Sequence, residues 1–379
     1  MSQITVLGAG MVGSAIARDL APRHDVRSVD RDEAALAVLA HHGVAVQQAD
    51  LSSDEAVQQA IADADLVVCA VPGFMGHRTL SAILKAGKNV VDISFMPEDA
   101  LQLDGLAKEH GVVAVVDMGV APGMDNLILG HHDAEMTVSR FECLVGGLPR
   151  TRTYPFEYKA PFSPIDVIEE YTRPARYVAN GQTVVLPALS EPELVDFEGI
   201  GTLEAFNSDG LRSIIDTMPH IPDMKEKTLR YQGHRDLMAA LSAGGFFDTE
   251  PIGMGGHRVR PIDATSAILL NAWKLGPDEE EFTVMRVTVE GNERGVDVRY
   301  VYDLHDVFDH GSRTSSMART TGYACTSMVE QVLSGDYAAV GVSTPEVAGR
   351  TEGVLERALT YQRVRGITYR RTRTPVAHL

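Results

Sequence analysis

Short apolar runs alternate with amphipathic segments through the first third of the chain. The run from Ile4 to Leu7 precedes a segment of helical periodicity from Ser14 to Leu20, and this alternation continues to Asp117. Nearly continuous apolar runs of this kind are typical of parallel strands that are buried on both faces. We therefore expect an α/β domain with a doubly wound parallel Rossmann sheet, whose strands lie at 4–7, 26–30, 44–50, 65–72, 89–94 and 112–117.

The pattern changes after Asp117, where the alternation of strands and helices stops. Residues 282–290 and 296–304 alternate apolar and polar positions around a turn at 291–295, which predicts an antiparallel hairpin. We therefore expect a second α+β domain with a mostly antiparallel sheet. An amphipathic helix at 315–333 carries small residues suited to close packing, so we expect it to return to the first domain.

The end of the chain, 341–379, is rich in arginine and predicts only a peripheral helix and tail. Length alone favours two or three domains. The predicted domains are 1–120, which binds NAD, 121–312, which binds substrate and forms a dimer, and 313–379, whose helices partly return to the first domain.

A glycine-rich turn joins the first predicted strand to the first helix. Gly8, Gly10 and Gly13 follow the G-x-G-x-x-G pattern. The first glycine permits the tight turn, the second lets the backbone approach a pyrophosphate, and the third allows helix and strand to pack closely. Asp30 ends the next strand at about the 20-residue interval that dinucleotide-binding domains show. The pattern therefore predicts a dinucleotide whose phosphates lie at the helix N-terminus.

Asp30 also bears on the choice between NAD and NADP. Its carboxylate can accept hydrogen bonds from a ribose 2′-hydroxyl, whereas a 2′-phosphate would meet like charge, a repulsion of about 4 kcal/mol at ~4 Å and an effective dielectric of about 20. Arg31 could partly offset this repulsion by holding a phosphate, so we expect NAD and keep NADP as the less favoured alternative. The predicted cofactor-binding residues are Gly8, Gly10, Met11, Val12, Gly13, Asp30, Arg31, Asp50, Leu51, Ala70, Val71 and Pro72.

Composition narrows the class of function. The chain of 379 residues has 52 acidic and 34 basic residues, a formal net charge of −18, which disfavours nucleic acid because its phosphates would be repelled. The sequence shows no apolar stretch of about 18 residues and no targeting segment, so we expect no membrane partner. Its three cysteines are far apart, and their odd number indicates reduced thiols in the cytoplasm.

Several segments resemble the saccharopine dehydrogenase-like superfamily. The segments that carry this resemblance are 92–97, 119–123, 146–149, and Tyr158-Lys159 with Ser163-Pro164. Within the superfamily, four further segments are most similar to L-lysine 6-dehydrogenases: 94–98, 169–176, 208–213 and 228–234. The likeness covers about residues 1–335.

The resemblance implies that NAD oxidises the ε-amino group of L-lysine to give allysine and ammonia. Relatives that form saccharopine typically carry an acid where Ala121 stands and an arginine near Ser208, and their absence favours a smaller substrate. The alternative is a reductive condensation of an amine with a semialdehyde, as in saccharopine reductases or carboxynorspermidine synthases. We expect an amino acid as the substrate and a homodimer, because the second domain would otherwise expose its sheet.

Hydride can leave the ε-carbon only when the nitrogen lone pair is free to form an iminium. Neutralising an ε-ammonium at pH 7 costs about 4.6 kcal/mol, so the reaction needs a base, a lowered pKa or an alkaline medium. Water then attacks the imine, and we expect no metal to be needed. The candidate bases are His234, which we favour on chemistry although a structural role is open, Asp209, for which a helix cap is the alternative, and His77.

The α-carboxylate of the substrate calls for a guanidinium fork. Arg212 is the first candidate because it follows the turn of Ser208, Asp209 and Gly210. Tyr158 could line the cleft, although an aromatic side chain at a strand end is more often structural. The other predicted substrate-binding residues, some of which we expect to form ordinary ion pairs, are Arg173, Arg176 and Arg230.

Overall fold

The computed structural model describes residues 1–160, 164–276 and 279–376. The chain forms two compact units, each built from separate stretches of sequence. Unit 1 consists of residues 1–137 and 317–369, and unit 2 consists of residues 138–316 and 370–379. The predicted functions of the ranges 1–120, 121–312 and 313–379 stay predictions.

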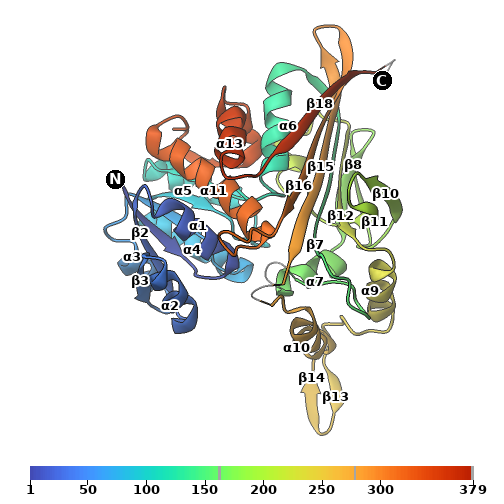
Figure 1. The fold of residues 1–379 in the computed structure, drawn as a ribbon, viewed down its shortest axis with the longest axis horizontal. Helices are drawn as coiled ribbons and strands as arrows, with labels where there is room; N and C mark the ends of the chain where they lie inside the picture. Colours follow the sequence, from blue (N-terminus) through green and yellow to red (C-terminus); the bar gives the residue numbers. More distant parts are fainter. Residues whose placement is uncertain (161–163, 277–278, 377–379) are drawn as a thin grey trace. The chain divides into compact units, whose positions relative to one another are not determined.

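Unit 1 contains a seven-stranded sheet in the order β17-β6-β5-β4-β1-β2-β3 (Figure 1). All of its pairings are parallel, which confirms the predicted doubly wound α/β fold. The apolar runs form its central strands because side chains on both faces are covered by helices. The strands are β1 (Gln3–Leu7), β2 (Asp25–Asp30), β3 (Ala45–Gln48), β4 (Leu66–Cys69), β5 (Asn89–Asp92), β6 (Val113–Val115) and β17 (Gly341–Ser343).

Helices connect the strands of unit 1 and cover its sheet. The late helix α11 packs against α1, where Gly322 approaches Ala15 and Ile16 so closely that an added Cβ would lie within 3.5 Å of both. Small residues therefore allow this contact, as the sequence pattern indicates. The helices are α1 (Met11–Leu20), α2 (Glu33–His41), α3 (Asp54–Ala60), α4 (Gly73–Lys85), the 3₁₀ helix η1 (Ala100–Leu103), α5 (Asp104–Glu109), α6 (Met124–Glu135), α11 (Ser316–Ser334), α12 (Pro345–Gly349) and α13 (Val354–Arg363).

Unit 2 contains a nine-stranded mixed sheet in the order β10-β11-β12-β7-β15-β16-β18, with β8 paired to β12 and β9. β12 and β7 are parallel, whereas the hairpins of the sheet are antiparallel. The predicted hairpin is confirmed in β15 and β16, whose turn is Arg294-Gly295. The strands are β7 (Thr137–Pro149), β8 (Ala175–Ala179), β9 (Gln182–Leu186), β10 (Glu193–Phe197), β11 (Gly201–Asn207), β12 (Asp223–Arg230), β15 (Glu281–Glu293), β16 (Val296–Val307) and β18 (Tyr369–Pro375).

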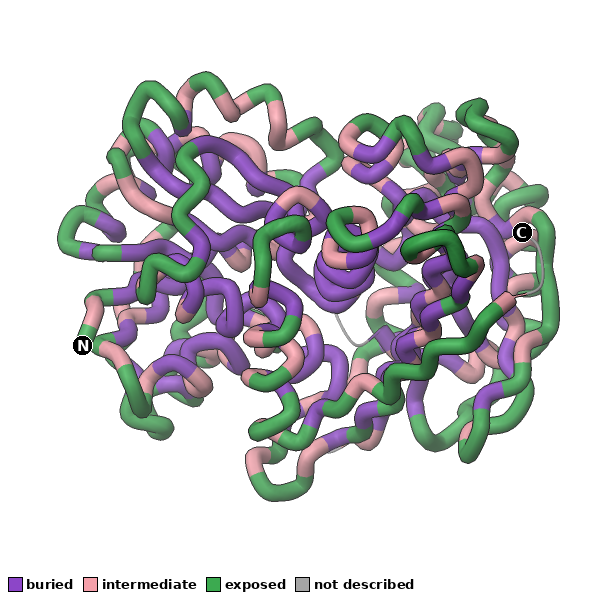
Figure 2. The backbone as a smooth tube through the Cα atoms, turned by 90° about the horizontal axis from the view of Figure 1, so that it is seen from above, coloured by how far each residue is buried: buried purple, intermediate pink, exposed green. Residues whose placement is uncertain are grey.

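Aromatic side chains form a second core where the helices of unit 2 meet its sheet. Tyr171, Phe206 and Trp273 are buried together there. Figure 2 colours the backbone by burial and shows buried and exposed stretches alternating along the chain. The remaining elements of unit 2 are α7 (Pro164–Thr172), α8 (Ile214–Thr217), α9 (His234–Ala243), α10 (Pro261–Trp273) and the two-stranded sheet of β13 (Ile252–Met254) and β14 (His257–Val259).

The C-terminal stretch differs from the expected peripheral helix and tail. β17 joins the edge of the parallel sheet beside β6, and β18 joins the sheet of unit 2 beside β16. Both additions depend on partners far away in sequence, and local periodicity does not report such partners. Within the described part of the chain, no helix has the length and apolar character needed to cross a membrane.

Candidate functional site

The turn between β1 and α1 is shaped by the absence of side chains. Gly8 has a φ of +112°, and a Cβ there would overlap the carbonyl oxygen of Ala70 at the end of β4. A Cβ on Gly13 would overlap the carbonyl oxygen of Gly8, so this glycine allows the helix to pack against the turn. Gly10 is different, because a Cβ there would meet no atom within 4 Å. The space above Gly10 is therefore open to a ligand rather than filled by the fold.

The N-terminus of α1 supplies hydrogen-bond donors to that space. Gly10 is the N-cap and has no side chain that could accept from the first N–H groups, and the first turn contains no acidic residue. The N–H groups of Met11 and Val12 begin the helix, where the helix dipole favours negative charge. The structure therefore fits the pyrophosphate of a dinucleotide at this turn.

Asp30 links the end of β2 to the glycine-rich turn. Its Oδ2 accepts a hydrogen bond from the backbone N–H of Ala9 at 2.7 Å, and its Oδ1 accepts from the N–H of Asp32 at 2.9 Å. The carboxylate thus holds both neighbouring loops while its remaining lone pairs can accept from a ribose hydroxyl. The carbonyl of Arg31 accepts from Gln48 at 3.2 Å, which fixes its backbone and leaves its side chain exposed.

The remaining predicted cofactor residues lie at the carboxyl ends of β3 and β4. The Asp50 carboxylate accepts from the N–H of Ser52 at 3.0 Å, and the carbonyl of Leu51 accepts from Arg78 at 2.6 Å. Ala70 and Val71 follow β4, and Pro72 is the N-cap of α4. Ligands of doubly wound sheets bind at this edge, so the residues have the expected position, and their contacts with a cofactor stay predictions.

Asp92 and Asp117 are two buried acids near the carboxyl ends of the strands, and no pattern in the sequence predicts that they lie near each other. Asp92 ends β5 with no exposed surface, and both of its carboxylate oxygens accept from the Ser94 hydroxyl at 2.8 Å. Burial raises the pKa of Asp92 to about 7, and the nearby charge of Asp117 adds to this rise. Hydrogen bonds from Cys69 and Ser94 oppose it. The carboxyl ends of β4 and β5 are therefore tied together around one acid that can keep its proton.

In unit 2 the favoured base, His234, lies inside a buried hydrogen-bonded chain. Its Nδ1 is 2.8 Å from the carbonyl oxygen of Phe156, which can only accept, so Nδ1 carries the proton and Nε2 is the acceptor. The hydroxyl of Tyr171 therefore donates to Nε2 at 3.0 Å and accepts from Nε of Arg230 at 3.1 Å. Arg230 also pairs with Glu170 at 2.6 Å.

The buried surroundings and the charge of Arg230 keep His234 neutral. Burial lowers the pKa of His234 to about 3, and the charge of Arg230 acts in the same direction. The ring of Tyr158 lies against the guanidinium of Arg230, 4.5 Å from its carbon, and burial raises the pKa of the Tyr158 hydroxyl. A base with its lone pair already bonded to Tyr171 must exchange that bond before it can take a proton, so the catalytic role of His234 stays a prediction.

Three of the other candidate side chains of unit 2, Arg173, Arg176 and Asp209, form ion pairs. Arg176 and Asp209 form a bidentate pair, with distances of 2.9 Å from Nε to Oδ1 and 3.1 Å from Nη2 to Oδ2. Arg173 pairs with Glu169 one turn earlier on α7. Arg212 follows the predicted turn with a φ of +47°. The structure thus brings Asp209 to Arg176, and Arg230 to Tyr158 and His234, whereas substrate contacts stay predictions.

His77 has a different setting from the other candidate bases. It lies in α4 of unit 1, and its Nε2 is buried without a hydrogen-bond partner in the described residues. Its role as a base stays a prediction. Ser163, part of the resemblance in sequence, lies outside the described residues.

Comparisons with known proteins match both parts of the chain to one family. A family model described as the saccharopine dehydrogenase NADP binding domain matches residues 4–115, and one described as the saccharopine dehydrogenase C-terminal domain matches residues 119–367. The apo structure of saccharopine dehydrogenase (L-Glu forming) from Saccharomyces cerevisiae has a TM-score of 0.79 at 18% identity, covering 99% of this chain and 100% of that one. This likeness in structure confirms the fold.

Three relatives show how far the likeness in sequence extends. Saccharopine dehydrogenase [NADP(+), L-glutamate-forming] of Schizosaccharomyces pombe is 25% identical over 65% of this chain and 59% of its own length. Carboxyaminopropylagmatine dehydrogenase of Synechocystis is 21% identical over 91% of this chain and 92% of its own. The match to the α-aminoadipic semialdehyde synthase of Arabidopsis thaliana covers only 20% of that longer protein.

Proposed function

Because the chain belongs to the saccharopine dehydrogenase family, we propose that it is an NAD(P)-dependent dehydrogenase that joins an amine to a semialdehyde, or cleaves the resulting secondary amine. The observation that carries the proposal is the turn around Gly10, which is open to a pyrophosphate and is held by Asp30 at 2.7 Å from the N–H of Ala9. This turn lies in a chain whose two parts both match the family.

The proposed reaction balances without a metal. In the direction of cleavage, a secondary amine, NAD(P)⁺ and water give a semialdehyde, a primary amine, NAD(P)H and a proton. A nicotinamide held at this turn would supply the hydride acceptor for the carbon that bears the nitrogen, and water would hydrolyse the resulting imine. The chain has to hold the phosphates at the N-terminus of α1 and leave the amine nitrogen unprotonated. In the reductive direction the same groups act in reverse order.

The names of the relatives support condensation rather than release of ammonia. One of them forms L-glutamate from saccharopine with NADP⁺, and another is a dehydrogenase of carboxyaminopropylagmatine. Both names describe a secondary amine that contains an amino-acid part. The second match covers nearly the whole of both chains, which makes it the stronger of these two supports.

Oxidative deamination of the ε-amino group of L-lysine is the second candidate, and Ala121 favours it. Ala121 lies in the loop between β6 and α6, at the position where the resemblance implies an acid in saccharopine-forming relatives. The methyl group of Ala121 cannot form hydrogen bonds or ion pairs with the charged groups of a glutamyl substrate, whereas an acid at this position can. A smaller amine would therefore fit, and ammonia would take the place of the amine product.

We propose NAD as the preferred cofactor, because the Asp30 carboxylate at the end of β2 would repel a 2′-phosphate. The family model carries NADP in its description, and Arg31 is exposed beside Asp30. Titrating the protein with NADH and with NADPH, and following nicotinamide fluorescence, gives the two dissociation constants directly. Equal or tighter binding of NADPH contradicts the preference for NAD.

A set of three assays on the full chain separates the two reactions. Allysine with L-glutamate, and a four-carbon amino-acid semialdehyde with agmatine, are each mixed with NADH or NADPH, and L-lysine is mixed with NAD⁺. The main proposal expects loss of absorbance at the nicotinamide band in one of the first two mixtures. Formation of NADH and free ammonia from lysine would instead establish the second candidate. Tight NADH binding with no turnover in any mixture would overturn both.

A further inference from the structure

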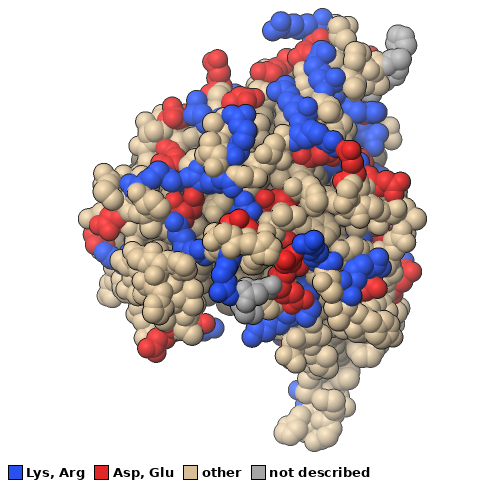
Figure 3. Space-filling model, in the orientation of Figure 1, with Lys and Arg blue, Asp and Glu red and all other residues tan. Residues whose placement is uncertain are grey.

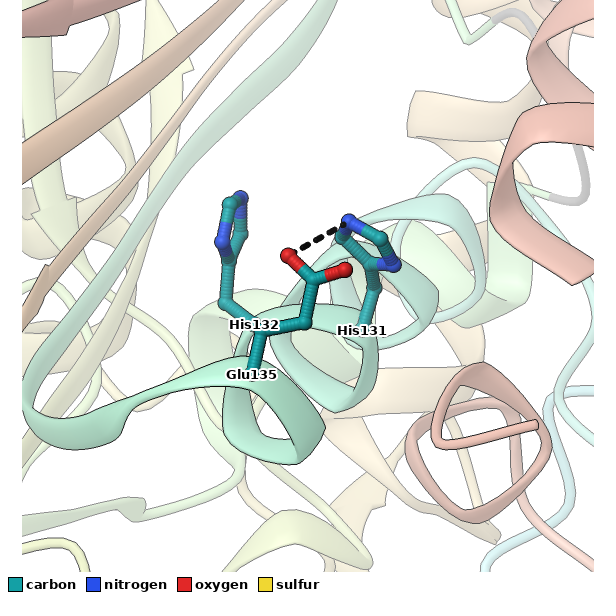
Figure 4. A group of neighbouring side chains, drawn as sticks. All are labelled: His131, His132 and Glu135. Atoms are coloured by element: carbon teal, nitrogen blue, oxygen red, sulfur yellow. Dashed lines mark ion pairs between the residues drawn. The ribbon is translucent and has the colours of Figure 1, made fainter. Parts of the chain in front are cut away.

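The last turn of α6 in unit 1 carries two imidazoles and a carboxylate side by side. His131, His132 and Glu135 each offer a ligand atom, and these atoms all lie within 4.8 Å of one another. Figure 4 shows the carboxylate of Glu135 between the two rings, with its ion pair to Nε2 of His131 at 3.5 Å. The ring centroids of the histidines are 5.1 Å apart.

The helix brings these three side chains together, although their spacing along the sequence is not a known metal-binding motif. Glu135 follows His131 by four positions and His132 by three, and both spacings place side chains on the same side of a helix. His132 is buried, His131 is 15% exposed and Glu135 is 51% exposed at the side chain. The two rings are therefore held in place, while the carboxylate is free to move toward a ligand between them.

α12 fixes the backbone that carries the three side chains. A Cβ on Gly130 would overlap the carbonyl oxygen of Glu346, and one on Gly349 would overlap that of Leu127, so the two helices touch backbone to backbone. Arg350 of the loop after α12 pairs with Asp133 at 2.7 Å. This pair directs the remaining acid of the turn away from the cluster, and α6 cannot shift without breaking it.

The position favours a positive ion. The C-terminus of a helix carries a partial negative charge from its unpaired carbonyls, which attracts cations. The formal net charge of −18 adds a general attraction of the same sign. Imidazole nitrogen with one carboxylate oxygen is a donor set for zinc, nickel or cobalt, whereas magnesium and calcium prefer oxygen ligands.

We propose that His131, His132 and Glu135 form a binding site for a divalent first-row transition metal ion at the end of α6. Each histidine would use one ring nitrogen and leave the other to a second partner, as metal-bound histidines usually do. Bond lengths of about 2.0–2.2 Å require the ligand atoms to approach one another, and the exposed side chain of Glu135 can supply that movement. Water would complete the coordination of the metal.

Zinc binding to the full chain tests the site. After treatment with a chelator and its removal, we expect isothermal titration with Zn²⁺ to show one saturable site per chain. His131→Ala and Glu135→Gln should each weaken the affinity by about tenfold or more, because each removes one of three ligands. Both positions are partly exposed, so these variants should fold. Replacing Zn²⁺ by Co²⁺ should give the absorption spectrum of a cobalt ion with a low coordination number. A purely structural effect of the substitutions would not produce this spectrum.

The chain offers a matched control in His41 and His42, a second pair of adjacent histidines at the end of α2. Both are exposed and have no acid three or four positions later. The double variant His41→Ala with His42→Ala should therefore leave Zn²⁺ affinity unchanged. No saturable binding in the wild type, or equal affinity in the His131 and Glu135 variants, would overturn the proposal. Loss of binding in the control variant would also overturn it, because the ion would then bind elsewhere.

Discussion

The proton on Asp92 is controlled by its surroundings rather than by its own chemistry. The carboxyl group has no exposed surface, and it accepts hydrogen bonds from the N–H and hydroxyl of Ser94. Burial raises its pKa to about 7, so between about pH 4 and pH 7 it keeps a proton that an ordinary aspartate has lost. A neutral acid here avoids placing a second negative charge near Asp117 beneath the predicted cofactor site.

The shifted pKa of Asp92 should make the stability of the protein depend on pH. The unfolded chain releases the Asp92 proton near pH 4, and the folded chain releases it near 7. Between these values the folded state binds more protons, so raising the pH lowers the free energy of unfolding. Compared with Asp92→Asn, the wild type should lose up to about 4 kcal/mol between pH 4 and pH 8. Urea unfolding of both proteins across this range is the measurement, and parallel curves would contradict it.

His234 shows the opposite shift. Its folded pKa of about 3 lies below the ordinary value, and its two ring nitrogens are bonded to the Phe156 carbonyl and the Tyr171 hydroxyl. This setting explains why the residue type alone does not establish a base: the same imidazole can connect two buried polar groups.

Replacing His234 by Ala separates the structural and catalytic roles. The substitution leaves the Tyr171 hydroxyl and the Phe156 carbonyl without this partner, at about 1–3 kcal/mol each, so the urea midpoint should fall. If His234 is also the base, turnover of the folded variant should fall far more than its affinity for NADH. Initial rates and NADH titration of the same preparation decide this. An unchanged rate in the folded variant removes His234 from the mechanism.

At the scale of elements, the β1–α1 turn shows why two glycines of one pattern differ. Gly13 has no room for a side chain because Gly8 lies against it, whereas the space at Gly10 is open. Gly13 is therefore required by the packing of the fold, whereas Gly10 is required by the ligand.

Two alanine variants test this difference. Gly10→Ala should keep the thermal unfolding midpoint and lose about tenfold or more in NADH affinity, because its methyl group occupies the space for the pyrophosphate. Gly13→Ala should lower the midpoint by several degrees, since the overlap with Gly8 forces helix and strand apart. Thermal unfolding and fluorescence titration of the two proteins provide the comparison. Unchanged affinity in Gly10→Ala would place the cofactor elsewhere.

At the scale of the whole molecule, the excess of acidic residues does not exclude local positive surface. Figure 3 shows Lys and Arg side chains gathered over β18 and its neighbour β16. Exposed Arg370 and Arg373 on β18 pair with Glu198 and Glu293 of the same unit. These ion pairs are exposed, so each contributes little stability, and β18 depends mainly on its place in the sheet.

The homodimer stays a prediction that concerns the assembled molecule. Sedimentation equilibrium of the full chain should give a mass twice the 41.0 kDa of one chain at micromolar concentration. A mass of one chain across the whole concentration range would contradict it. Adding NADH during the same experiment shows whether assembly depends on the cofactor.

Local patterns were sufficient for six of the seven strands of the Rossmann sheet and for the β15–β16 hairpin. Strand runs, helical periodicity and the spacing of Gly8, Gly10 and Asp30 all lie within short stretches, so each could be recognised without knowing what packs against it. The same holds for the family, whose segments are contiguous. The identity of the amine does not follow, because it depends on a few side chains whose partners come from distant strands.

The sequence by itself determined a dinucleotide-binding α/β unit followed by a largely antiparallel one, because periodicity and glycine spacing are properties of neighbouring residues. Only the tertiary structure decided that the pKa of Asp92 is raised, that His234 is a neutral link and that β17 and β18 join two different sheets. It also decided which arginines are paired with carboxylates. Burial and charge pairing arise from tertiary contacts between segments that are far apart in sequence. Free energies of protonation and binding depend on these contacts rather than on residue type alone.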